Sequence, residues 1–230
     1  MTPGSQDTHA PDLHAHEAPG ACCAPPPEDL LSDAGFRRAL WVSLALNAGM
    51  FVIETGAGLS AGSVSLQADA LDFLGDSASY AISLLVLSGP ARWRTLSAAL
   101  KGVAMLCFGL WVIGVTVWSL INQGVPNPVV MGSVGTLALV VNVFCAVLLF
   151  RFRGGDANMR SVWLCSRNDA ISNIAVILAA SGVFATGTNW PDLAVAAVMA
   201  SLALYASALV LAHARREWRA NGLATAAPRH

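Results

Sequence analysis

The sequence predicts an all-α membrane protein with six transmembrane helices, and three observations carry this prediction. Hydrophobic residues make up 55% of the 230-residue chain. Charged residues make up only 12%, well under the roughly 25% that soluble domains contain. The apolar residues gather in six long segments, not in the short alternating stretches that are typical of a membrane β-barrel.

Each apolar segment is long enough to cross a bilayer as a tilted helix. Glycine and proline residues, which favour turns, occupy the breaks between the segments. We expect the helices near residues 37–60, 63–88, 94–122, 128–152, 157–186 and 190–217.

The basic residues predict the orientation of the chain. Basic residues lie before the first segment, in the second and fourth breaks, and after the sixth segment. The other three breaks contain no Lys or Arg. By the positive-inside rule, both termini are expected in the cytoplasm. We expect the protein to lie in the lipid bilayer of a bacterial inner membrane. Lys101 lies deeper in the third segment, and we expect it to snorkel toward the inner surface.

Residues 1–34 form a polar, proline-rich tail, which is expected to be disordered and cytoplasmic. The tail contains His14, His16, Cys22 and Cys23, whose imidazoles and thiols suit borderline and soft metals. Metal capture and a tail without a role both remain open. Residues 35–219 form the predicted transmembrane domain, and residues 220–230 a short cytoplasmic tail. The net charge of −1 argues against a nucleic-acid partner.

The second segment carries an unusual stripe of acids, Asp69, Asp72 and Asp76. Their spacing of i, i+3 and i+7 confines them to an arc of roughly 60° on a helix. Buried carboxylates are costly in a bilayer, and residues 63–88 contain no Lys or Arg to neutralise them. The stripe therefore predicts a cationic partner from outside this helix, and a metal ion is the partner we expect.

The fifth segment offers a matching pair, Cys165 and Asp169, which lie one helical turn apart. Together with Asp72 and Asp76 they would supply three carboxylates and one thiolate to a tetrahedral site. This mixed set favours Zn²⁺ or Cd²⁺ over Mg²⁺ or Ca²⁺. The alternative is that Cys165 is an inert buried thiol, which is how we interpret Cys107 and Cys145.

Several other polar residues are candidates for a secondary metal site or an ion pathway. Asn47 and Glu54 are seven residues apart on the first segment, and Asn173 continues the stripe of Cys165. Asp69 and the His and Cys residues of the tail belong to the same group of candidates. Hydrogen bonding between helices is the competing interpretation for the asparagines.

In these residues and their spacing, the chain resembles the cation diffusion facilitator family of metal transporters, and the resemblance covers residues 37–217. The resemblance is carried by residues 47–54, 65–76 and 165–169. Asp72, Asp76 and Asp169 match the family's [His/Asp]-xxx-Asp and His-xxx-Asp pairs, while Cys165 replaces the usual histidine. Members usually continue into a cytoplasmic metal-binding domain that helps them dimerise, whereas here a short tail follows Arg219. The resemblance implies a homodimer.

The expected function is that of a secondary transporter that exports divalent cations of the Zn²⁺/Cd²⁺ class, with Co²⁺ and Ni²⁺ as further candidates, by proton antiport. Metal ligands must be deprotonated to bind, so metal binding and protonation oppose each other. The alternative is a membrane metal sensor or assembly partner that transports nothing. No convincing nucleophile and base point to an enzyme, and no cofactor is expected besides the transported metal ion.

Overall fold

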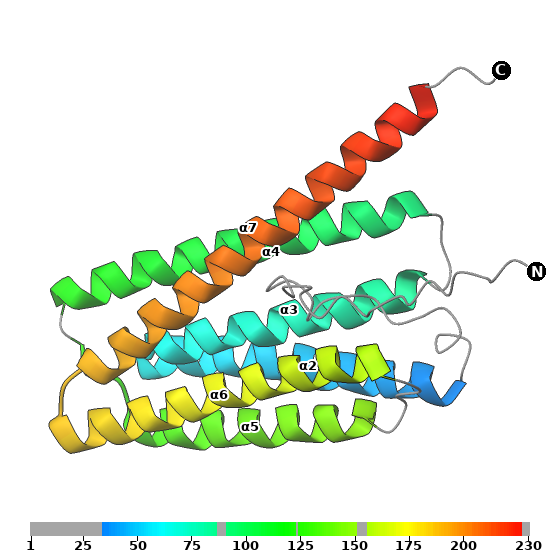
Figure 1. Ribbon diagram of the computed structural model, residues 1–230. Coiled ribbons are helices and arrows are strands. Elements are labelled where there is room, and N and C mark those ends of the chain that lie inside the picture. The colour runs from blue at the N-terminus through cyan, green and yellow to red at the C-terminus, as the bar shows by residue number, and fades with distance from the viewer. Residues whose placement is uncertain (1–33, 87–90, 123, 151–155, 227–230) are drawn as a thin grey trace, which may run out of the picture.

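The computed structural model describes residues 34–86, 91–122, 124–150 and 156–226. Within these ranges the chain forms six helices and no strand (Figure 1). The helices are α2 (Ala34–Ala61), α3 (Val64–Val86), α4 (Ala91–Asn122), α5 (Pro128–Phe150), α6 (Asp156–Thr186) and α7 (Trp190–Ala226). Each begins and ends within a few residues of the sequence prediction, except that α7 continues past residue 217 to Ala226. The tail with His14, His16, Cys22 and Cys23 lies outside the described residues.

Neighbouring helices pack as antiparallel pairs, α2 with α3, α4 with α7 and α5 with α6. In Figure 1, α7 crosses α4 obliquely, and its C-terminal part extends away from the other helices. Small residues allow close helix contact, as membrane helices require. A Cβ atom at Gly109 of α4 would lie 2.8 Å from Leu204 Cδ2 of α7, and one at Gly135 of α5 would lie 3.3 Å from Val176 Cγ1 of α6.

Five of the described helices are long and apolar enough to cross a membrane, and α3 is the exception. Four of the five other described helices pack around it, since α3 contacts α2, α4, α6 and α7. Every residue from Ser63 to Leu71 is buried, whichever side of the helix it occupies. Because protein encloses α3, its three aspartates do not face lipid, and the helix does not need an apolar surface.

Large apolar side chains cover the outside of the bundle. Phe184, Ile121 and Val129 are each more than 70% exposed, on three different helices. A water-soluble protein rarely exposes apolar surface on this scale, whereas a lipid-facing surface requires it. The fold therefore confirms an integral membrane protein.

The three breaks without Lys or Arg lie together at one end of the bundle (Figure 1). Gly62 and Gly187 turn the chain with φ angles of 68° and 62°, a conformation that glycine adopts without steric cost. Asn127 joins two of the breaks, because its backbone N–H donates to the Ala61 carbonyl at 3.0 Å. Its side-chain oxygen also caps α5 through the N–H of Val129.

Candidate functional site

The acid stripe of α3 faces a different partner at each level of the bundle. At the level nearest the uncharged breaks, Asp69 meets Glu54 of α2. Both residues are almost completely buried, with exposures of 1% and 0%. Glu54 shares the buried face of α2 with Asn47, as their spacing predicts.

The carboxylates of Glu54 and Asp69 lie close enough to interact electrostatically. Ionised carboxylates only accept hydrogen bonds, so a bond between these two requires a shared proton. None of the four oxygens has a donor in the structure. Two buried carboxylates without donors form a site that needs either a proton or another cation.

One turn further along α3, Asp72 turns toward α6. The hydroxyl of Ser172 of α6 is close enough to influence the Asp72 carboxylate. Asp72 is partly exposed, unlike Asp69. This contact connects the stripe of α3 with the helix that carries the second predicted pair of ligands.

Asp76 interacts with Tyr80, one turn further along α3. The Tyr80 hydroxyl donates to Asp76 Oδ2 at 3.2 Å, and the same side chain is close enough to Asp169 for an electrostatic interaction. Asp76 and Asp169 are both partly exposed. Asp72, Asp76 and Asp169 are thus carried by two helices that contact each other, α3 and α6.

The fourth predicted ligand, Cys165, belongs to α6, but its side chain lies outside the part of the molecule that the structure describes. Among the side chains that are described, no three His, Cys, Asp or Glu residues come close enough together to hold a metal ion. The four-ligand site accordingly stays a prediction. Arg167 lies between Cys165 and Asp169 in the sequence. Its side chain also lies outside the part of the molecule that the structure describes.

The two candidate asparagines, Asn47 and Asn173, each donate a hydrogen bond to a carbonyl of their own helix. Asn173 is buried and donates to the Asp169 carbonyl at 2.8 Å, while its side-chain oxygen has no donor. Asn47 donates to the Ser43 carbonyl at 2.8 Å and to Cys145 Sγ at 3.5 Å, which links α2 to α5. Cys145 is a free, buried thiol, as expected, whereas Cys107 is free but exposed, so the expectation that it is buried was wrong.

Lys101 does not snorkel toward the surface, contrary to the sequence-based expectation. It is only 6% exposed, and its Nζ donates to the Ser79 hydroxyl of α3. The ammonium also interacts electrostatically with Asp76. The prediction was wrong because α3 offers this ammonium a hydroxyl partner, one turn from Asp76, inside the bundle.

Sequence reasoning also missed Asp192, at the start of α7. Its carboxylate accepts hydrogen bonds from the Ser63 hydroxyl at 2.8 Å and from the backbone N–H groups of Val64 and Ser65 at 2.8 and 3.0 Å. These are the first residues of α3, so Asp192 caps that helix from another helix. The cap anchors the start of the acid-bearing helix to α7.

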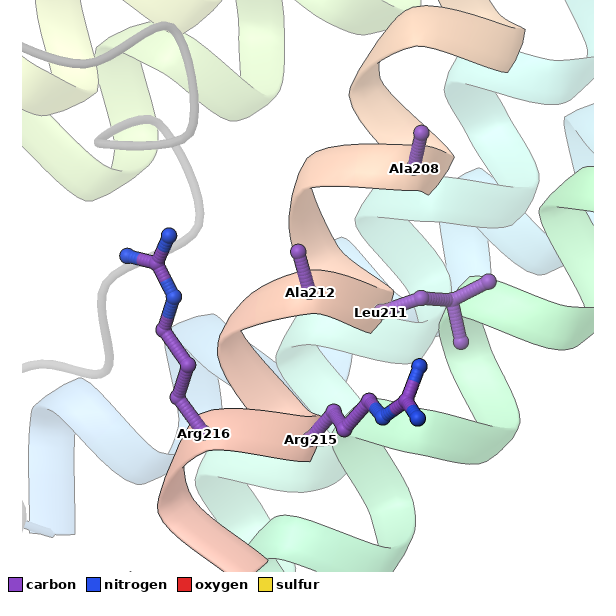
Figure 2. A pocket seen from close by; sticks show the side chains of 5 residues that line it. All are labelled: Ala208, Leu211, Ala212, Arg215 and Arg216. Carbon is purple, nitrogen blue, oxygen red and sulfur yellow. The ribbon is translucent and has the colours of Figure 1, made fainter. Parts of the chain in front are cut away.

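A hollow of about 490 Å³ lies elsewhere, beside the opposite end of α7. It is lined by Ala208, Leu211, Ala212, Arg215 and Arg216. Figure 2 shows these side chains on successive turns of α7, with the two arginines extending in different directions. The lining contains no carboxylate or thiol, so this hollow is not a candidate metal site.

The fold and the acid stripe together define a class of membrane protein: a bundle of membrane-spanning helices packed around an acid-bearing helix. The chain belongs to the cation efflux family, because the cation efflux transmembrane domain matches residues 40–217.

Among curated proteins, the chain is 26% identical over 184 residues to the cadmium, cobalt and zinc/H⁺-K⁺ antiporters of Bacillus velezensis and Bacillus subtilis. It is 23% identical over 198 residues to the metal cation efflux system protein CzcD of Cupriavidus metallidurans. These matches cover 73% and 81% of the chain, and the chain spans 58% of the length of each relative.

Proposed function

We propose that this protein is a secondary transporter that moves divalent metal ions of the Zn²⁺/Cd²⁺ class out of the cytoplasm in exchange for protons. The observation that carries the proposal is the acid stripe of α3, a helix that packs against α2, α4, α6 and α7 inside the bundle. Membership of the cation efflux family supports it, as do the names of the similar antiporters. Co²⁺ and Ni²⁺ are further candidate cargoes.

The proposed binding site consists of Asp72, Asp76, Cys165 and Asp169. In the structure, the three carboxylates are partly exposed, whereas Glu54 and Asp69 are buried. The α3 residues from Asp76 to Ile82 are all partly exposed, while Ser63 to Leu71 are all buried. This difference supports access to the site from the end of the bundle opposite the uncharged breaks.

That end is the cytoplasmic side in our proposal. Exposed Arg37 and Arg38 lie at the start of α2, and exposed Arg215 and Arg216 lie toward the end of α7. All four are at the end of the bundle that the positive-inside rule assigns to the cytoplasm. A topology reporter joined after His230 tests this, since activity only outside the cell contradicts the assignment.

Proton coupling follows from the chemistry of the ligands. A carboxyl or thiol group must lose its proton to bind metal, so metal entry releases protons and protonation releases metal. An inward proton gradient then drives export if the site meets the cytoplasm deprotonated and the outside protonated. The Glu54–Asp69 pair lies outward of the site on α3, and we propose that it lines the exit.

The experiment is metal flux into proteoliposomes under a fixed proton gradient, measured with Zn²⁺ and with Cd²⁺. Asp76→Ala and Asp169→Ala should abolish flux while the variants remain folded. Ser201→Ala is the control, because this exposed hydroxyl bonds only to its own helix, at the Ala197 carbonyl. Wild-type protein that binds metal but shows no flux would favour the alternative, a membrane sensor or assembly partner. We also propose that the protein is a homodimer, as the family resemblance implies. Crosslinking in the bilayer tests this on the same sample.

A further inference from the structure

The feature that the proposed transport site does not yet explain is a buried lysine beside it. Lys101 is the most buried basic residue among the described side chains, at 6% exposure. Its Nζ donates to Ser79 Oγ, and Ser79 in turn donates to the Gly75 carbonyl at 2.8 Å. The ammonium is therefore held against α3 by a defined contact.

The packing of α4 on α3 fixes this position. A Cβ atom at Gly75 would lie 3.2 Å from Met105 Cε, so the two helices approach closely at this level. Met105 is one turn from Lys101 on α4, and Ser79 is one turn from both Gly75 and Asp76 on α3. The close approach thus brings the ammonium beside the turn of α3 that carries Asp76.

We propose that Lys101 is a built-in counter-cation of the metal site, which lowers the affinity for metal and speeds metal release. This inference rests on the proposed function. A fixed positive charge repels a dication bound at Asp76, and the repulsion is weakly screened inside the bundle. The same charge stabilises Asp76 when no metal is bound, because a buried carboxylate without a cation is costly. Lys101 therefore shifts the balance between the loaded and empty site toward the empty one.

The test compares purified full-length wild type with Lys101→Gln, Lys101→Met and Lys101→Arg. Equilibrium Zn²⁺ binding is measured at about pH 8, where carboxyl groups of ordinary acidity are ionised and protons compete least. Both neutral variants should bind Zn²⁺ about tenfold more tightly, a change that corresponds to roughly 1.4 kcal/mol. Lys101→Arg keeps the charge and should retain the wild-type affinity. Arg216→Gln removes an exposed charge toward the end of α7 and should change nothing.

Zn²⁺ flux supplies a second readout. The neutral variants should reach half-maximal flux at lower Zn²⁺ concentration, and their maximal flux should fall because release is slower. A merely structural role for Lys101 would weaken binding when the charge is removed, not strengthen it.

The outcomes are distinguishable. Unchanged or weaker Zn²⁺ binding in folded Lys101→Gln and Lys101→Met overturns the counter-cation role. Failure of both neutral variants to fold, with Lys101→Arg intact, assigns the lysine to stability and also overturns it. Wild-type protein that neither binds nor transports Zn²⁺ or Cd²⁺ refutes the proposed function itself, and this inference with it.

Discussion

The Asp192 carboxylate of α7 accepts a hydrogen bond from the backbone N–H of Val64, the first residue of α3, at 2.8 Å. A helix leaves its first N–H groups without partners, and a side chain on the same segment usually satisfies them. Here a residue more than a hundred positions away supplies the acceptor. Its negative charge is also favourable at the positive end of the α3 dipole.

Asp192→Ala should therefore lower stability by at least the ~0.5–2 kcal/mol that the loss of a helix cap usually costs. Asp192→Asn should cost less, because its amide oxygen still accepts. The measurement is the thermal unfolding midpoint in detergent, with Ser201→Ala on the same helix as the control. Equal midpoints for Asp192→Ala and wild type would show that water replaces the carboxylate at no cost.

The contact between α2 and α3 depends on Gly58. A Cβ atom at this position would lie 2.8 Å from Gln67 Cγ and 3.1 Å from the Gln67 nitrogen and the Ser63 carbonyl oxygen. Two of these atoms belong to the backbone and cannot move aside. Gly58→Ala should lower stability by about 1–3 kcal/mol, the usual cost of overpacking.

Gly49→Ala is the matched control on the same helix, since a Cβ atom at Gly49 would meet nothing within 4 Å. It should leave the protein unchanged or slightly more stable, because alanine favours helix over glycine. Both variants are compared by thermal unfolding in detergent. Similar midpoints for the two alanine variants would mean that α2 and α3 can separate freely.

Some of this arrangement was accessible from the sequence. The spacing of Asp69, Asp72 and Asp76 depends only on helical geometry, and the structure keeps all three on one enclosed helix. Gly62 and Gly187 mark turns because their backbone conformation is local. Features that depend on one or a few neighbouring residues were thus predictable.

Other features depend on which helices meet. An isolated lysine near the end of an apolar segment can reach the surface or an internal acid, and only the packing of α4 on α3 selects Asp76 as the neighbour of Lys101. In the same way, Asp192 looks like a residue that caps its own helix. Nothing in its local sequence indicates that it caps α3. The relation between Glu54 and Asp69 also required the register of α2 against α3.

Glu54→Gln should stabilise the protein and impair its transport. The amide of glutamine can donate to the Asp69 carboxylate, which has no donor in the structure, and the change removes one of two opposed acids. We expect a gain of about 1–3 kcal/mol, the usual penalty for an unsatisfied buried polar group. Flux should fall because the proposed exit loses a charge.

The control is Glu54→Ala, which removes the same charge without supplying a donor. It should be less stable than Glu54→Gln, while its flux falls similarly. Thermal unfolding and Zn²⁺ flux are measured on both. If Glu54→Gln unfolds at a lower temperature than wild type, the two carboxylates do not oppose each other in the native protein.

Deleting residues 1–30 should leave maximal flux nearly intact and raise the metal concentration required for half-maximal flux. The deletion removes His14, His16, Cys22 and Cys23, which are candidates for metal capture, but leaves all six helices in place. Replacing only these four residues by serine in the full-length chain is the control for length. Loss of flux at saturating metal would show that the tail has another role.

Cys165 should set the preference of the transporter between Cd²⁺ and Zn²⁺. A thiolate is a softer ligand than imidazole, and Cd²⁺ is the softer of the two ions. Cys165→His should retain Zn²⁺ flux and lower Cd²⁺ flux relative to it, and Cys165→Ser should also affect Cd²⁺ more. We expect the Cd²⁺/Zn²⁺ flux ratio to fall by roughly tenfold or more, since even mutating the residues that hydrogen-bond to metal ligands changes metal affinity by about 10–100-fold.

Cys107→Ser, at an exposed thiol on α4, is the matched control and should leave the ratio unchanged. The test is flux of each ion into proteoliposomes under the same proton gradient. An unchanged ratio in both Cys165 variants would identify this thiol as a packing residue and leave the site with carboxylate ligands alone.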